Sequence, residues 1–465
     1  MSLLAVGAQD QYLTASPEIS YFKQVIKRTT NFSMESLRQV FLTKPTLDTS
    51  SVQSFTCRIG RHGDLLGDIF LCFTLPAIYS DGDPANGSLQ FRWIRNLANH
   101  MITRYYVSID TQIIDERWGD WMDVWNELSM PNDKKYGYDS MIGNVEEFTG
   151  PRDLRPRVIV HDNRLIYNVY PNSTQASPSI ASRTFYVPLD FWFTKNPAVA
   201  LPLVALQYQN IDVTIEFRNI EQLYQVWDTT TAEYISPSRY RSLGRQRDVS
   251  ITRFLSHSAN VGQVPSVLGS IDLNAYLECN FYFLDTPERS YIAAANTDYI
   301  IDRVYRSHYY GLAKGANIIE LILSNPVKEI VWVLRRSDMS NYNDWHNFTA
   351  HLPMDGKYST LESAKIMWNG VDRFEEKPAA YFNCLQPYQF HTTSPRPGIY
   401  AYSFSMFPEK MQPSGSFNAS MISKIDLSLN TVNYASFDNY ECIVYSLYYN
   451  VFRVMGGSGG MVFAN

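Results

Sequence analysis

The chain has 465 residues, of which 18% are charged and 14% aromatic, and its formal net charge at neutral pH is −6. A chain of this length can bury a large core, and its aromatic content excludes intrinsic disorder, which requires low hydrophobicity. The chain also lacks the clustered positive charge needed to bind a phosphate backbone, so we expect no nucleic acid among its main partners. No segment holds the roughly 18 consecutive apolar residues of a membrane-spanning helix.

The N-terminal residues and the cysteines indicate a cytosol-like compartment. The opening residues Met1–Val6 lack the basic start and the apolar length of a signal peptide. Five widely spread cysteines form no Cys-x-x-Cys pair: Cys57, Cys72, Cys279, Cys384 and Cys442. An odd number of scattered cysteines is typical of reduced thiols.

Near the N-terminus, the segment Ser16–Ile26 predicts a short amphipathic helix. Ser16 is a suitable N-cap, and a proline follows it at the first helical position. One face would then carry Ile19, Phe22 and Ile26. The stretch is made locally positive by Lys23, Lys27 and Arg28. These charges indicate either a solvated face or a contact with an acidic partner or lipid head groups.

Most of the remaining chain is typical of β-strands. Apolar and polar residues alternate strictly in Ile211–Phe217 and Lys424–Asn430, which predicts strands with one buried and one exposed face. The continuous apolar runs Ile69–Phe73 and Ile330–Leu334 predict strands covered on both sides. In the tail, alternate residues from Ile443 to Val451 share one face. Many short strands separated by proline- and glycine-rich turns indicate a sandwich or barrel.

One longer helix is predicted at Asp115–Leu128. Its tryptophans Trp118, Trp121 and Trp125 fall near one stripe with Leu128, and acidic residues occupy its first turn, where the helix dipole favours them. We interpret the aromatic stripe as core rather than as a ligand site.

Two internal similarities suggest a duplicated chain. Asn99–Val107 resembles Asn325–Val333, and Gln207–Val213 resembles the segment around Tyr448–Val454. They predict two tandem β-domains of similar length, joined by a polar, arginine-rich connection. The expected division is an N-terminal arm at 1–28, a first domain at 29–221, the connection at 222–248 and a second domain at 249–465.

The motifs that could carry chemistry are weak. Gly456–Gly460 matches G-x-S-x-G, but the five residues after it cannot form the helix that a nucleophile elbow requires. Asp81–Gly87 resembles a calcium loop interrupted by a proline, and is interpreted as a surface turn. The carboxylate pairs Asp123 with Glu127 and Glu375 with Glu376 are interpreted as solvated faces. The eight histidines show no metal-ligand spacing. We therefore expect no catalytic, cofactor-binding or metal-binding residue.

Several segments, in order along nearly the whole chain, share motifs with one known family. They are Val6–Thr14, Ile114–Leu128, Phe283–Arg289, Asn325–Val333, Tyr400–Ser420 and Tyr449–Met455. The most specific is the run FPEKMQPSGS at Phe407–Ser416. On these motifs the chain resembles the major capsid proteins of the nucleocytoplasmic large DNA viruses. In its length and general sequence character it resembles the marseillevirus group most.

The resemblance implies an all-β protein made of two tandem eight-stranded jelly rolls, with short helices in the loops and an N-terminal arm. It implies a homotrimer, a pseudo-hexagonal capsomer that tiles the icosahedral shell of a large DNA virus. It further implies contacts with neighbouring capsomers and with minor capsid and penton proteins. The arm would face inward, toward minor capsid proteins or an internal membrane. The protein would be a non-enzymatic part of the virion capsid, assembled in the host cell cytoplasm.

Two alternatives from other functional classes stay open at this point. A jelly-roll carbohydrate- or receptor-binding surface protein would present loops rich in Tyr and Trp. An enzyme on a β-sandwich, such as a glycosidase, would place a pair of carboxylates in a cleft.

Overall fold

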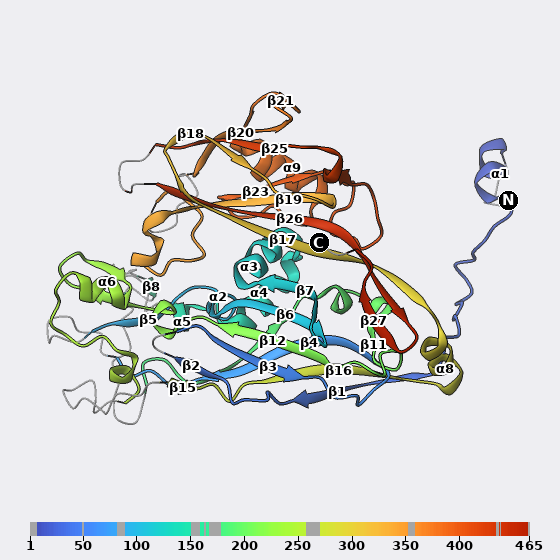
Figure 1. Ribbon diagram of the computed structural model, residues 1–465, viewed down its shortest axis with the longest axis horizontal. Helices are drawn as coiled ribbons and strands as arrows, with labels where there is room; N and C mark the ends of the chain where they lie inside the picture. Colours follow the sequence, from blue (N-terminus) through green and yellow to red (C-terminus); the bar gives the residue numbers. More distant parts are fainter. Residues whose placement is uncertain are drawn as a thin grey trace.

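Two β-sandwiches lie one above the other in the computed structural model, with a few helices between and around them (Figure 1). The structure describes residues 7–48, 51–80, 89–149, 159–161, 164–166, 178–256, 270–351, 359–433, 437 and 439–463. All strand pairs in the two sandwiches are antiparallel among these residues.

The first sandwich consists of two sheets. One runs in the order β1 (Phe32–Gln39), β16 (Tyr276–Leu284), β4 (Leu65–Leu75) and β10 (Arg183–Pro188), with β11 (Leu201–Pro202) paired to β4. The other runs in the order β3 (Gln53–Arg58), β12 (Ile211–Phe217), β6 (Ile102–Ile109) and β7 (Gln112–Trp118).

The second sandwich repeats this plan. One sheet has the order β17 (Thr297–Leu312), β26 (Tyr440–Met455), β19 (Pro326–Arg336) and β23 (Ile399–Ser403), extended by β24 (Phe417–Asn418) and β27 (Ser458–Met461). The other has the order β18 (Gly315–Glu320), β25 (Ile425–Thr431), β20 (Leu361–Trp368) and β21 (Val371–Asp372), with β22 (Lys377–Pro378) paired to β20.

The topology of both sandwiches is that of a jelly roll. Counted along the chain, the eight main strands of each follow the spatial orders 1-8-3-6 and 2-7-4-5. The expected pair of tandem eight-stranded jelly rolls is therefore confirmed. Of the strands predicted by alternation, Ile211–Phe217 is β12 itself, and β25 begins one residue later than expected.

The remaining elements lie in the connections. The smaller strands are β2 (Thr46–Asp48), β5 (Phe91–Trp93), β8 (Ile159–His161), β9 (Arg164–Ile166), β13 (Tyr224–Asp228), β14 (Glu233–Ile235) and β15 (Ser270–Asp272). The α-helices are α1 (Ala8–Thr14), α2 (Leu97–Met101), α3 (Gly119–Ser129), α4 (Asn132–Ile142), α5 (Glu146–Thr149), α6 (Pro237–Ser242), α8 (Thr286–Ala294) and α9 (Gln386–Phe390). The shorter helices are η2 (Trp192–Thr194), η3 (Pro197–Val199), η4 (Ile220–Gln222), η5 (Ile251–Phe254), η6 (Ser337–Asn341), η8 (Ala419–Met421) and the π-helix η7 (Tyr381–Leu385). None of the described helices has the length and apolar character to cross a membrane.

The internal similarities matched strands that are not equivalent. Asn99–Val107 enters β6, the fourth strand of its jelly roll, whereas Asn325–Val333 enters β19, a third strand. Likewise, Gln207–Val213 enters a seventh strand and Tyr448–Val454 lies in an eighth. The similarities therefore reflect the common alternation of strands, although the duplication they suggested is present.

Strand pairing does not follow the expected boundary of the second domain at residue 249. Beyond that point, β15 pairs with β2, and β16 pairs with both β1 and β4 of the first sandwich. The stretch 222–248 also contributes β13, which pairs with β5. The reason is that an eighth strand must return to pair with the first, a long-range contact that no local pattern reveals. We propose to divide the chain at α8 instead.

The predicted helix at Ser16–Ile26 is wrong. A helix forms earlier, as α1, and Ser16 has a positive φ of 56°, whereas an N-cap residue is extended. The apolar face that was expected to stabilise this helix is exposed, with Phe22 fully in solvent. No packing of the described arm residues favours a helix at the predicted position. Helix α1 also buries no residue, and its start is held instead by a hydrogen bond from the Gly7 N–H to the Asp10 carboxylate at 3.0 Å.

The tryptophan helix begins later than predicted. Asp115 to Trp118 belong to β7, which pairs with β6, and α3 starts at Gly119. A Cβ atom at Gly119 would lie 2.0 Å from the carbonyl oxygen of Asn99 and 2.1 Å from that of Ile102. The strand-to-helix corner therefore requires glycine at this position.

Candidate functional site: the junction of the two sandwiches

Helix α3 of the first sandwich fills the space between the two sandwiches (Figure 1). Trp121 stacks on Trp125 with ring centroids 5.2 Å apart and lies 4.9 Å from the ring of Tyr445 on β26. These side chains form one buried cluster with residues from all four main strands of the facing sheet: Val304, Val331, Val333, Ile399, Ala401, Ile443, Tyr445 and Leu447. The prediction that the aromatic stripe is core is confirmed, and the core in question joins the two sandwiches.

Asp120 of α3 binds cations from both sandwiches. Arg335 of the second sandwich donates to it, and Arg306 lies 3.6 Å away. From the first sandwich, Arg218 lies 3.9 Å and His100 3.2 Å from the same carboxylate. Burial opposes the charged form of Asp120, yet the charges of Arg335 and Arg218 and the hydrogen bond with His100 hold the pKa of Asp120 well below its usual range. The junction thus contains a buried, fully ionised carboxylate.

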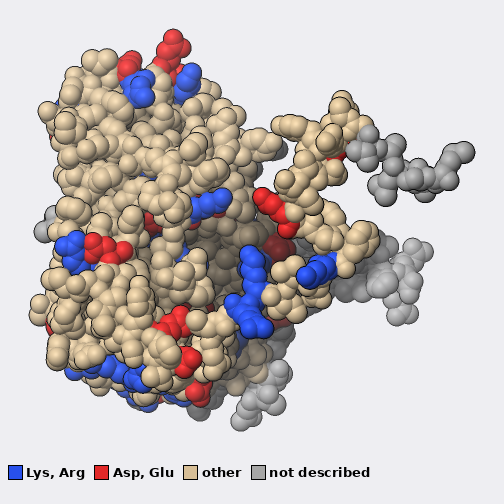
Figure 2. All heavy atoms as spheres, turned by 90° about the vertical axis from the view of Figure 1, so that its right-hand side faces the viewer, with Lys and Arg blue, Asp and Glu red and all other residues tan. Residues whose placement is uncertain are grey.

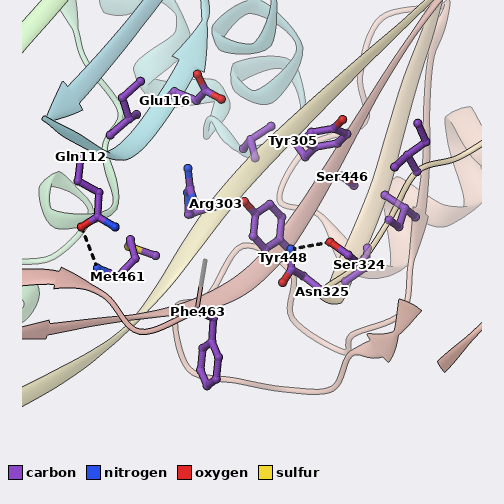
Figure 3. Close-up of a pocket in the computed structure, with 15 residues that line it drawn as sticks. Gln112, Glu116, Arg303, Tyr305, Ser324, Asn325, Ser446, Tyr448, Met461 and Phe463 are labelled. Atoms are coloured by element: carbon purple, nitrogen blue, oxygen red, sulfur yellow. Dashed lines mark hydrogen bonds between the residues drawn. The ribbon is translucent and has the colours of Figure 1, made fainter. Parts of the chain in front are cut away.

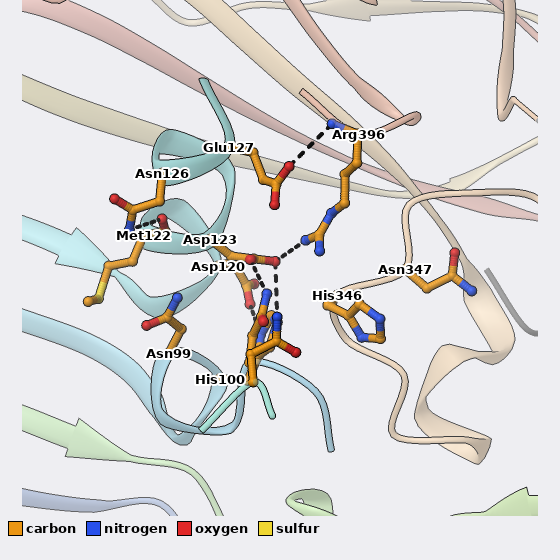
Figure 4. Close-up of polar contacts among 12 residues, drawn as sticks. Asn99, His100, Asp120, Met122, Asp123, Asn126, Glu127, His346, Asn347 and Arg396 are labelled. Atoms are coloured by element: carbon orange, nitrogen blue, oxygen red, sulfur yellow. Dashed lines mark hydrogen bonds and ion pairs between the residues drawn. The ribbon is translucent and has the colours of Figure 1, made fainter. Parts of the chain in front are cut away.

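Asp123, one turn further along α3, makes a second ionic link (Figure 4). It accepts hydrogen bonds from Arg396 of the second sandwich and from Asn96, and His100 Nε2 lies 3.5 Å away. Glu127 accepts a hydrogen bond from the backbone N–H of Arg396 at 3.4 Å. The expectation that Asp123 and Glu127 form a solvated face is therefore wrong, because the second sandwich covers this side of α3.

Asp302 on β17 carries a third link. Lys328 Nζ lies 3.0 Å from both of its carboxylate oxygens, and Lys195 of the first sandwich lies 3.4 Å away. Arg117 of β7 donates to the Asp302 carbonyl at 3.0 Å. Burial lowers the pKa of the Lys328 ammonium, and Asp302 opposes that shift.

His391, in the connection after α9, lies between two carboxylates of the second sandwich. Its Nε2 is 2.5 Å from Glu329 and its Nδ1 is 3.0 Å from Glu409. The ring also meets Trp125 of α3 edge-on, at 6.1 Å between centroids. Burial acts against the charged imidazole, but Glu329 and Glu409 raise the pKa of His391 to about 9.

The end of the chain returns to the first sandwich. Phe452 and Val454 of β26 lie in the core of that sandwich, and Tyr208 N–H donates to the Gly457 carbonyl at 3.2 Å. The G-x-S-x-G match is the hairpin between β26 and β27, in which Gly456 and Gly457 have positive φ. It contains no strand-to-helix elbow, as expected from the sequence.

A cavity of about 580 Å³ opens at the junction (Figure 3). Its lining includes Gln112, Glu116, Arg303, Tyr448 and Phe463, from both sandwiches. Glu116 is the acidic residue among the described lining residues, and Arg104, which lies outside the lining, binds it at 2.6 Å. The cavity therefore does not present the pair of free carboxylates that a glycosidase requires.

The other sequence candidates are dispersed. Asp81–Gly87 lies outside the described residues. Glu375 and Glu376 are exposed, away from the junction cavity. Within the described ranges, no group of three or more His, Cys, Asp or Glu side chains is arranged to hold a metal ion.

Sequence reasoning missed the partners of α3. Arg335 directly follows the buried run Ile330–Leu334 and Glu329 precedes it, so charges at the ends of a strand covered on both sides were a usable signal. Such charges need buried partners.

Comparisons with known proteins agree with this architecture. Residues 20–240 match the family model described as major capsid protein N-terminus, and residues 288–460 match that of the large eukaryotic DNA virus major capsid protein. The chain is 31% identical to the major capsid protein of Pyramimonas orientalis virus, over 100% of this chain and 99% of that protein. It is 28% identical to that of Phaeocystis pouchetii virus, with the same coverage.

Solved structures show the same fold. A chain of the PBCV-1 virus capsid matches with a TM-score of 0.68 and 24% identity, covering 96% of this chain and all of that one. The Faustovirus major capsid protein matches with a TM-score of 0.68 and 14% identity, covering 97% and 94%. The fold and its junction thus define a double jelly-roll capsid protein. The chain belongs to the major capsid proteins of large eukaryotic DNA viruses, whereas its finer likeness to the marseillevirus group stays a prediction.

Proposed function

We propose that three copies of this chain close into a ring of six jelly rolls, a pseudo-hexagonal capsomer that tiles an icosahedral shell. The observation that carries the proposal is the pair of topologically equivalent sandwiches joined side by side by α3. A closed threefold assembly of such pairs has approximate sixfold symmetry, which suits it to tile a flat facet. The ionic links of Asp120, Asp123 and Asp302 support this role, because they restrict the angle between the sandwiches.

The N-terminal arm supports contacts inside the shell. It projects from the body at one end of the molecule (Figures 1 and 2) and exposes large apolar side chains together with Lys23, Lys27 and Arg28. We propose that it binds minor capsid proteins or the surface of an internal membrane. Neighbouring capsomers and penton proteins would contact the other sides of the ring.

We propose a structural role without catalysis and assembly in the host cell cytoplasm. The junction carboxylates Asp120 and Asp123 are bound by arginines rather than free. All five cysteines are described, and none is in a disulfide, which suits a reducing compartment.

The molar mass of the purified protein in solution tests the trimer. Light scattering should give about 160 kDa, three times the 53.5 kDa of one chain, and electron micrographs should show a hexagonal outline. A stable monomer under assembly conditions would overturn the proposal.

A further inference from the structure

The connection between the fifth and sixth main strands carries a helix in both sandwiches. In the first sandwich it joins β7 to β10 and begins with α3. In the second it runs from β21 to β23 and holds η7 and α9. The two helical segments are therefore topologically equivalent.

Within the chain, α3 packs on the outer face of the sheet β17-β26-β19-β23. Among the described residues, the equivalents of both partners keep exposed apolar side chains. On η7 and α9, Leu385 is partly exposed and Tyr388 is 81% exposed. The equivalent sheet is β1-β16-β4-β10, and Figure 1 shows β1 and β16 on the side of the first sandwich away from the second.

The outer face of β1-β16-β4-β10 carries two groups of aromatic and apolar side chains, with polar residues between them. Met34, 59% exposed, is opposite Tyr282 in the pairing of β1 with β16. Tyr186, 45% exposed, and Tyr276 are both opposite Cys72 of β4. Directly opposite residues share one face of a sheet, so each group forms one patch on this face. The polar pairs Ser36–Asn280 and Arg38–Glu278 lie between the two patches.

We infer that the η7–α9 segment of one chain docks on the outer face of β1-β16-β4-β10 of the next copy in the ring. The inference rests on the proposed trimer. In a ring where first and second sandwiches alternate, each second sandwich must meet the first sandwich of another copy. Approximate sixfold symmetry then places equivalent elements at equivalent contacts, so the junction inside the chain is the template for the junction between chains.

The loop after β23 enlarges the docking surface on the second sandwich. Ser403 N–H donates to Gln386 of α9 at 3.1 Å, so that the end of β23 is attached to the helix. Just beyond, Met406 and Phe407 are exposed. Tyr, Phe and Met are the residue types enriched in protein interfaces, where their apolar surface is removed from water.

The first test places a charge on the helix. Tyr388→Glu should lower the mass in solution threefold, to that of one chain, while the near-ultraviolet circular dichroism keeps its native form. The matched control is Tyr12→Glu, because Tyr12 of α1 is 88% exposed and lies on neither surface. The control should stay trimeric.

The second test addresses the opposite surface and the native thiol. Tyr186→Glu should also give a folded monomer. Cys384, the exposed cysteine of the five, lies on η7 and should react with a maleimide in either monomer but be protected in the wild-type trimer.

The outcomes separate the two proposals. A wild-type trimer in which Cys384 reacts fully, or in which Tyr388→Glu and Tyr186→Glu both leave the mass unchanged, overturns this docking surface and leaves the trimer intact. A wild-type monomer overturns the proposed trimer itself, and this inference with it.

Discussion

At the scale of single residues, the junction depends on buried charges whose partners come from both sandwiches. Asp120 is almost fully buried and is neutralised by Arg335, Arg306 and Arg218. A buried ion pair adds little more to folding stability than a well-packed hydrophobic pair would. Removing one partner, however, leaves the other charge buried and uncompensated.

Asp120→Ala should therefore lower the free energy of unfolding by about 3–5 kcal/mol, measured by urea denaturation at a fixed protein concentration. The control is Asp372→Ala, which breaks the more exposed pair with Lys365 and should cost less than about 1 kcal/mol. Equal losses in the two variants would contradict a role for buried charge at the junction.

His391 makes stability depend on pH in the alkaline range. Its folded-state pKa, about 9, is above the ordinary 6.5, so the protonated imidazole stabilises the fold fully below about pH 6.5. That contribution is lost as the pH rises through 9. His391→Gln should remove a pH-dependent stabilisation on the order of 3 kcal/mol. The check is the urea midpoint from pH 6 to pH 10, which should fall for the wild type and change less for the variant.

At the scale of elements, the arm and α3 contrast. Both sequences carry apolar stripes, but α3 has a sheet to cover it, whereas residues 15–31 are non-helical and exposed. Amphipathic pattern alone therefore did not decide whether a helix formed.

Reversing the arm charges tests its proposed contact. A variant with Lys23, Lys27 and Arg28 all changed to Glu should form trimers of normal mass but assemble shells poorly, because the charges act on a partner outside the trimer. Sedimentation of assembled particles measures the effect, and a variant with the three residues changed to Arg, Arg and Lys is the charge-preserving control. Normal assembly of the Glu variant would reject the contact.

At the scale of the whole molecule, the two sandwiches share their cores. Helix α3 completes a cluster with the second sandwich, and Phe452 and Val454 of β26 complete the core of the first. Such an exchange makes the stability of each sandwich depend on the other.

We therefore expect both sandwiches to unfold together. Hydrogen exchange at increasing urea should give one midpoint for peptides from β12 and from β25. Trp121→Ala, which removes a fully buried ring at the junction, should separate the two midpoints, whereas Tyr136→Ala on the exposed side of α4 should not. Two midpoints in the wild type would show that the sandwiches are independent.

The sequence by itself determined the regularly patterned strands and the family. Alternation revealed β12 and β25, the apolar run at Ile330–Leu334 revealed the covered strand β19, and the Phe407–Ser416 motif indicated a capsid protein. These signals are local, because side-chain alternation and motif spacing depend on neighbouring residues.

Only the tertiary structure decided that β16 returns to pair with β1, more than 200 residues earlier, and that Asp120 and Asp123 lie buried beneath the second sandwich. Strand partners and buried ion pairs depend on which surfaces meet after long loops close. The pattern of a strand shows that it needs a partner, but the topology of the whole chain selects which one.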